Sequence, residues 1–126
     1  MLLGFDHVNI RTANLDAMIA WYSDILGLNP GARPDFGFPG AWLYLGDKAV
    51  VHLVGTDTPP QTGGDIALEH AAFRATGMPE FLAKLDANSI EYRLGVIEAV
   101  KTVQVNLSDP DGNHLHIDFD LSEMPT

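Results

Sequence analysis

The chain contains no cysteine among its 126 residues, so disulfides cannot contribute to its stability. Any metal site must therefore use nitrogen and oxygen ligands. No apolar run approaches the roughly 18 residues that a membrane-spanning helix needs, so we expect no membrane partner. The first residues lack a basic segment and a cleavage site. We therefore expect a cytoplasmic protein without a signal peptide.

Positive charge is also scarce, with 7 Lys and Arg against 17 Asp and Glu and a net charge of −10. Nucleic acids and anionic membranes bind through cations that neutralise phosphates, so the composition argues against both partners. It does not argue against a small anionic substrate, which a few arginines can hold. The length fits one domain spanning residues 1–126.

Four of the five histidines form two pairs with nearly the same offset. His7 and His70 are 63 residues apart, and His52 and His116 are 64 apart. His7 and His70 each follow an acidic residue and precede an arginine by four positions. A repeated half that supplies two histidines suits a metal site, because imidazole is the commonest neutral metal ligand near pH 7.

Hydrophobic periodicity predicts the same order of elements in both halves, namely a strand, a helix and three strands. In the first half we expect strands at 5–11, 28–30, 41–45 and 49–54, with a helix at 15–26 between Asn14 and Gly27. In the second half we expect strands at 66–74, 90–94, 100–107 and 114–119, with a helix at 79–88.

Two segments rich in Gly and Pro interrupt this pattern. Residues 31–40 predict an irregular loop that could act as a mobile lid. Residues 56–64 predict a linker midway along the chain, which gives modules at 1–58 and 65–126. In the last strand, alternation places His114, His116 and Asp118 on one face and the apolar residues on the other.

Specific motifs resemble the vicinal oxygen chelate superfamily. They are the two opening strands with His7 and His70, AMIAWYSDILG at residues 17–27, and DPDGN at residues 109–113. The superfamily includes glyoxalase I, extradiol dioxygenases, fosfomycin-resistance thiol transferases, bleomycin-binding proteins and methylmalonyl-CoA epimerase. The resemblance covers nearly the whole chain. It implies an α+β fold of two tandem βαβββ modules whose curved mixed sheets surround a metal cleft.

The resemblance also implies metal ligands on the first and fourth strands of each module. By position these are His7, His52, His70 and His116, which would hold one divalent transition metal per site (Fe, Ni or Zn). The family usually has glutamate at the position of His116, and glyoxalase I has glutamate at that of His52. Glyoxalase I uses its metal-bound glutamate as the base, so His52 and His116 are the catalytic candidates. An imidazole whose lone pair holds a metal cannot also accept a proton.

Other polar and aromatic residues are expected around these histidines. Asp118 and His114 share the face of His116 and could support the ligands, whereas Asp6 and Glu69 precede their histidines and are expected to point away from them. The candidates for substrate binding are Asn9, Arg11, Trp42, Tyr44 and Arg74. The arginines could equally be solvated strand ends, and the two aromatic residues could cover the core.

These observations favour a metal-dependent enzyme that acts on a small substrate with vicinal oxygens, as a glyoxalase-like lyase or isomerase. Two alternatives are a non-haem iron dioxygenase with an all-histidine site and a metal-free protein that binds a drug or metabolite. Family members commonly pair modules from two chains, so we also expect a homodimer.

Overall fold

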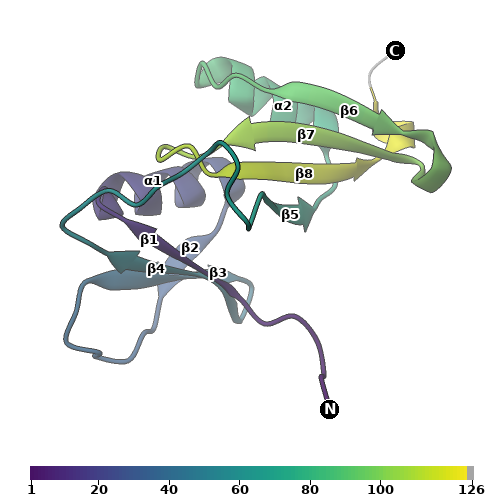
Figure 1. Cartoon of the computed structure of the whole chain (residues 1–126). Coiled ribbons are helices and arrows are strands. Elements are labelled where there is room, and N and C mark those ends of the chain that lie inside the picture. The colour runs from purple at the N-terminus through teal and green to yellow at the C-terminus, as the bar shows by residue number, and fades with distance from the viewer. Residues whose placement is uncertain (125–126) are drawn as a thin grey trace. The chain divides into compact units, whose positions relative to one another are not determined.

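The computed structural model describes residues 1–124 (Figure 1). They form two compact units, Met1–Gln61 and a second unit that begins at Thr62. The first module contains β1 (Val8–Thr12), α1 (Leu15–Leu26), β2 (Asn29–Gly31), β3 (Gly40–Leu45) and β4 (Lys48–Gly55). The second contains β5 (Ala71–Arg74), α2 (Met78–Ala87), β6 (Arg93–Ile97), β7 (Thr102–Ser108) and β8 (His114–Asp120). Two short 3-10 helices, η1 (Glu98–Val100) and η2 (Leu121–Glu123), follow β6 and β8.

Each module has one four-stranded mixed sheet, with strand order β1-β4-β3-β2 in the first and β5-β8-β7-β6 in the second. The β1–β4 and β5–β8 pairs are parallel, and all other pairs are antiparallel. The predicted α+β fold with two βαβββ modules is therefore confirmed. In both modules the first strand lies at the edge of its sheet and the last strand lies beside it.

In each module the helix packs an apolar stripe against its own sheet. Met18, Tyr22 and Ile25 are the buried residues of α1. On α2 the ring of Phe81 lies 5.7 Å from that of Phe119 in β8, measured between centroids. Because side chains alternate across a strand, the opposite face of each sheet is left to other residues. That face carries the histidines.

The structure differs from the predicted elements mainly at the first strand of each module. His7 and His70 lie directly before β1 and β5, where we expected them within longer strands. Ladder pairing begins only at Val8, which faces Val51, and at Ala71, which faces Leu115. Asn14 occupies the N-cap position of α1, but its side chain makes no capping hydrogen bond.

A further difference is β6, which begins at Arg93 and so lies three residues later than the strand expected from residue 90. Within residues 1–124, no helix is both long enough and apolar enough to span a bilayer.

Candidate metal centre

The second module brings three histidines to the face of its sheet that α2 does not cover. His116 lies in β8 between Ala72 of β5 and Asn106 of β7. His114 begins β8, and His70 directly precedes β5. The ring centroid of His70 lies 4.4 Å from that of His116 and 5.3 Å from that of His114.

Glu69 links two of these histidines. Its Oε1 lies 3.1 Å from Nδ1 of His70, and its Oε2 lies 2.6 Å from Nδ1 of His114. Hydrogen bonds from His114 and then His70 lower the pKa of the Glu69 carboxyl. One ligand atom from each of these three residues lies within 4.8 Å of the others. Two imidazoles and a carboxylate are a donor set that suits zinc or ferrous iron.

The surroundings of His114 also fit a ligand. Its second ring nitrogen, Nε2, lies 2.8 Å from Oδ1 of Asn106. Metal-bound histidines usually donate this other N–H to a nearby oxygen, which fixes the ring orientation. His114 was expected only to support the ligands, and the structure gives it the geometry of one.

The expectation that Asp6 and Glu69 point away from their histidines is wrong, because the Asp6 carboxylate contacts His7 and the Glu69 carboxylate contacts His70. It rested on the alternation of side chains along a strand, but Glu69 and His70 precede β5 and are not bound by that rule. The acidic residue directly before both His7 and His70 was the available signal, since its side chain can fold back onto the neighbouring ring.

His116 forms the most buried pair of the site. Its Nδ1 lies 2.6 Å from Oδ1 of Asp118. The His116 side chain is only 8% exposed, and that of Asp118 is 24% exposed. An Nδ1–H that donates to a carboxylate leaves the lone pair on Nε2, where it can take a metal or a proton.

The first module arranges its histidines differently, in a row of stacked rings. The rings of His7 and His52 are 3.6 Å apart at an angle of 12°, and Trp42 stacks on His52 at 4.2 Å and 14°. Imidazole lone pairs lie in the ring plane, so near-parallel rings direct them side by side. Across residues 1–124, the only three His or carboxylate groups whose donor atoms converge are those of the second module. His7 and His52 stay predicted ligands.

The stacking also affects protonation. Burial, and after it the neighbouring His7, lowers the pKa of His52. Asp6 Oδ2 lies 2.6 Å from Nδ1 of His7, and this hydrogen bond lowers the pKa of the Asp6 carboxyl. The lowered pKa favours the neutral His52 ring, which retains a lone pair.

The predicted substrate-binding residues are spread over both modules. Asn9 is exposed and is the ladder partner of His52 across the β1–β4 pair, so it lies beside the stacked rings. Tyr44 donates its hydroxyl to the carbonyl of Ala32 at 2.6 Å. Arg11 and Arg74 are exposed, and Arg74 is the ladder partner of Asp118. Sequence reasoning missed Arg33, which lies between β2 and β3 with its guanidinium over the rings of Phe36 and Phe38.

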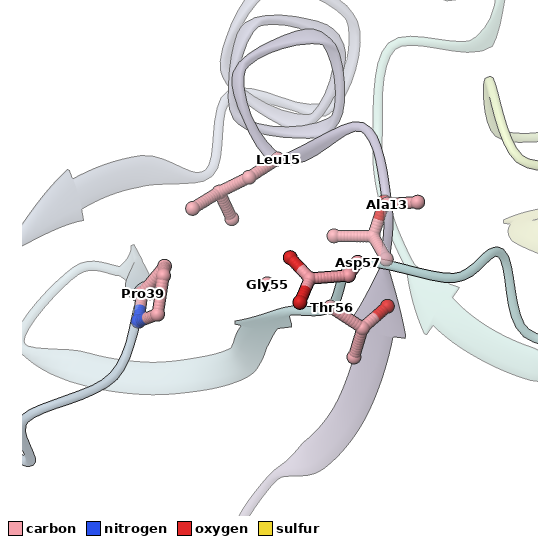
Figure 2. Close-up of a pocket in the computed structure, with 7 residues that line it drawn as sticks. Ala13, Leu15, Pro39, Gly55, Thr56 and Asp57 are labelled. Atoms are coloured by element: carbon pink, nitrogen blue, oxygen red, sulfur yellow. The ribbon is translucent and has the colours of Figure 1, made fainter.

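A separate pocket of about 320 Å³ opens where β1 and β4 end (Figure 2). Figure 2 shows the Asp57 carboxylate between Leu15, Pro39 and Thr56. No histidine lines this pocket. We therefore do not assign the metal chemistry to it.

Comparisons with known proteins agree with this architecture. The Glyoxalase/Bleomycin resistance protein/Dioxygenase superfamily profile matches residues 4–117, so the chain belongs to that superfamily. It is 28% identical over 123 residues to Glyoxylase I 4 of Arabidopsis thaliana, covering 92% of this chain and 70% of that protein. It is 28% identical over 127 residues to Biphenyl-2,3-diol 1,2-dioxygenase 3 of Rhodococcus globerulus, covering 94% of this chain and 64% of that protein.

A solved structure supports the fold. The glyoxylase/bleomycin resistance protein/dioxygenase domain from Frankia sp. EAN1pec superposes with a TM-score of 0.77 at 19% identity. The match covers 95% of this chain and 99% of that one.

Proposed function

We propose that this protein is a metal-dependent enzyme that acts on a small substrate with vicinal oxygens, as a glyoxalase-like lyase or isomerase. In this proposal Glu69, His70 and His114 hold a divalent transition metal, and His116 moves the proton. The observation that carries it is the convergence of three donor groups within 4.8 Å beside the Asp118–His116 pair.

The donor geometry supports this assignment of ligands. Metal–nitrogen and metal–oxygen bonds of about 2.1 Å place neighbouring ligand atoms roughly 3.4 Å apart in a tetrahedral site, and the three donor atoms here lie within 4.8 Å of one another. The contacts of Glu69 with the two imidazoles measure 3.1 and 2.6 Å. When bound, the metal supplies Lewis-acid polarisation of the substrate oxygens.

The proton transfer is assigned to His116 because its Nε2 keeps a free lone pair. In this assignment the imidazole accepts a proton from the carbon beside a substrate carbonyl and returns it to the neighbouring carbon. The Asp118 carboxylate holds the ring in the required tautomer and stabilises the imidazolium that forms. In this assignment the base is not a metal ligand. The family resemblance predicted that one residue, His116, would serve as both ligand and base.

The family resemblance predicts His7 and His52 of the first module as further ligands and His52 as a catalytic residue. Our assignment of the metal rests on Glu69, His70 and His114 alone and does not use them. Burial lowers the pKa of His52 and so favours the neutral ring, which has a lone pair to contribute. Asn9, Arg11, Trp42, Tyr44 and Arg74 remain proposed substrate contacts.

A ring-cleaving dioxygenase is the second candidate, and the same donor set favours it. Two histidines and one carboxylate are typical of non-haem iron oxygenases. One relative is named as a glyoxalase and another as a dioxygenase, each at 28% identity, so similarity does not separate the two activities.

The test begins with metal content, measured by mass spectrometry on protein purified without a histidine tag. The protein is then loaded with Fe, Ni or Zn and assayed for isomerisation of thiol adducts of 2-oxoaldehydes, and for oxygen uptake with catechols. Isomerisation supports the first candidate, and oxygen uptake supports the second. Protein that takes up no metal under any loading condition would show the proposal to be wrong and would favour a metal-free binding protein.

A further inference from the structure

Arg33 lies in the loop between β2 and β3, over the rings of two phenylalanines. Its guanidinium carbon is 4.9 Å from the ring centre of Phe36 and 5.2 Å from that of Phe38. The two phenylalanine rings are themselves stacked at 5.5 Å and 15°. Gly37, with a φ of 79°, provides the turn between them.

The guanidinium is held in place without a carboxylate partner. Nη2 of Arg33 donates to the carbonyl of Phe38 at 3.2 Å. This position of the guanidinium depends on Gly40, because a Cβ atom there would lie 2.7 Å from Nη2 of Arg33. In the described part of this acidic chain, the ion pairs found all involve histidine, and none involves Arg33.

One donor of Arg33 also has no hydrogen-bond partner. Its Nε is buried and unpaired. Buried polar groups are nearly always paired, so an unpaired donor on a fixed cation marks a place for an acceptor. A carboxylate can bind guanidinium through two parallel hydrogen bonds, from Nε and from one Nη. The missing partner is thus a planar anionic group.

Beside this cation lies the end of the stacked row. In this row the ring centroids of His7 and His52 are 3.6 Å apart, and those of His52 and Trp42 are 4.2 Å apart. The ring of Phe36 lies 6.1 Å from that of Trp42 and is tilted by 44° to it. Gly31 faces Trp42 across the β2–β3 pair and adds no side chain there. Phe36 and Phe38 are 46% and 47% exposed, so solvent reaches their rings.

The spacing between Phe36 and Trp42 is close to what a planar guest requires. Inserting a ring between two aromatic rings needs about 7 Å, twice the contact distance of roughly 3.5 Å. A shift of the loop by about 1 Å, with rotation of Phe36 until its ring is parallel to that of Trp42, would provide this spacing. The same shift would uncover the Nε of Arg33 beside the guest.

From these contacts we propose that Arg33, Phe36, Phe38 and Trp42 form a binding site for a planar, conjugated carboxylate. The aromatic rings hold the flat part of the ligand, and the guanidinium pairs with its carboxylate. The site lies wholly within the first module and does not depend on the metal centre proposed for the second. It identifies an aryl or conjugated carboxylate as the class of ligand.

The test uses Trp42 as the reporter in a Trp21→Phe variant, since the chain has two tryptophans. All titrations contain EDTA, so that a failure of the proposed metal chemistry does not affect the result. Three probes separate shape from charge: benzoate is planar and anionic, cyclohexanecarboxylate is anionic but not planar, and benzamide is planar but neutral. Benzoate should quench Trp42 saturably and bind at least about tenfold more tightly than either analogue, because only it supplies both a ring and a charged acceptor.

Arg33→Gln should weaken benzoate binding by roughly tenfold or more, since the charged pair is lost. Arg33→Lys should weaken it less, because the charge stays and the planar fork is lost. Lys84→Gln is the control, since it removes a positive charge from α2 in the other module. Equal binding of benzoate and cyclohexanecarboxylate, or unchanged binding to Arg33→Gln, would overturn the proposal.

A second measurement needs no substitution in the protein that is titrated. The Nε–H resonance of Arg33, assigned by its loss in Arg33→Lys, should shift on addition of benzoate to the wild-type chain. It should stay in place on addition of benzamide. If benzoate quenches Trp42 while this resonance does not move, the ligand binds the rings without the guanidinium and the proposal is wrong.

Discussion

Nδ1 of His116 lies 2.6 Å from Oδ1 of Asp118, two residues further along the same strand. Both side chains emerge from one face of β8, because residues two apart on a strand point the same way. The carboxylate therefore fixes the imidazole tautomer from within the strand itself. A single strand thus supplies both the proposed base and the group that orients it.

Asp118→Asn should lower turnover by about 100-fold or more, because the base loses the carboxylate that holds its tautomer and stabilises the imidazolium. The amide keeps the size of the carboxylate but can present its NH₂ to Nδ1 and favour the other tautomer. Nitrogen-15 chemical shifts of His116 report the tautomer directly and need no substrate. A wild-type pattern of shifts in Asp118→Asn would contradict the role of Asp118.

The proposed ligands predict an ordered series of metal affinities. His70→Ala and Glu69→Gln should lose most bound metal, because each removes one of three protein ligands. His116→Ala should retain metal and lose activity, because in our assignment it is the base. Metal content after dialysis against a weak chelator measures this series.

His114→Ala and His116→Ala are the matched pair, because both histidines lie on one face of β8. In our assignment His114→Ala should lose metal and His116→Ala should retain it. If His116→Ala empties the site and His114→Ala does not, the ligands are those expected from the family resemblance. Our assignment to Glu69, His70 and His114 would then be wrong.

Some of this site could be predicted from the sequence, and some could not. The helix at Leu15–Leu26 begins and ends where its periodicity and Gly27 predict, because both signals are local. The alternation along β8 correctly placed His114, His116 and Asp118 together, because a continuous strand obeys a period of two. Glu69 was misplaced because it lies just outside β5, where no such period holds. Arg33 was missed because its position depends on contacts within an irregular loop, which follow no pattern of spacing.

The lowered pKa of His52 predicts how stability depends on pH in the metal-free protein. Burial and the neighbouring His7 keep the pKa below the ordinary value of 6.5, so the folded state disfavours the protonated ring. The unfolded chain then binds more protons between these two pKa values, and His52 costs the fold stability as pH falls from about 6.5 to the lower folded-state pKa. An NMR titration of the His52 ring with EDTA present gives the midpoint.

Trp42→Leu is the matched variant for this effect, because it removes the ring that covers one face of His52. With less burial, the midpoint should move back toward 6.5. A His52 midpoint at or above 6.5 in the wild-type protein would show that the stacked row does not disfavour the charged ring.

Gly40→Ala should destabilise the first module by about 1–3 kcal/mol, the usual cost of forcing an extra carbon into a packed site. The added Cβ would meet the backbone oxygen of Leu53 and the guanidinium of Arg33. Gly95→Ala is the control, because the nearest atom to a Cβ there lies at 3.7 Å. Urea unfolding curves of the two variants give the comparison, and equal midpoints would show that the position of Arg33 does not require Gly40.

The chain should also form a homodimer. β1 and β5 each lie at one of the two edges of their sheet, and an unpaired edge can add a strand from another chain. The residues just before them are apolar and exposed at equivalent points of the repeat, with Phe5 81% and Leu68 85% exposed. Burying such surface at about 25 cal/mol per Å² favours association.

Repulsion between two copies of net charge −10 opposes that association, but salt screens it beyond about 10 Å at 0.1 M. Light scattering at micromolar concentration and moderate salt should therefore give twice the chain mass of 13.7 kDa. The double variant Phe5→Ser and Leu68→Ser should shift the protein toward monomer, whereas Val100→Ser, which changes an apolar residue that is 65% exposed in η1, should not. A wild-type monomer under these conditions, or a dimer that Phe5→Ser and Leu68→Ser leave intact, would show that the residues before β1 and β5 are not an interface between copies of this chain.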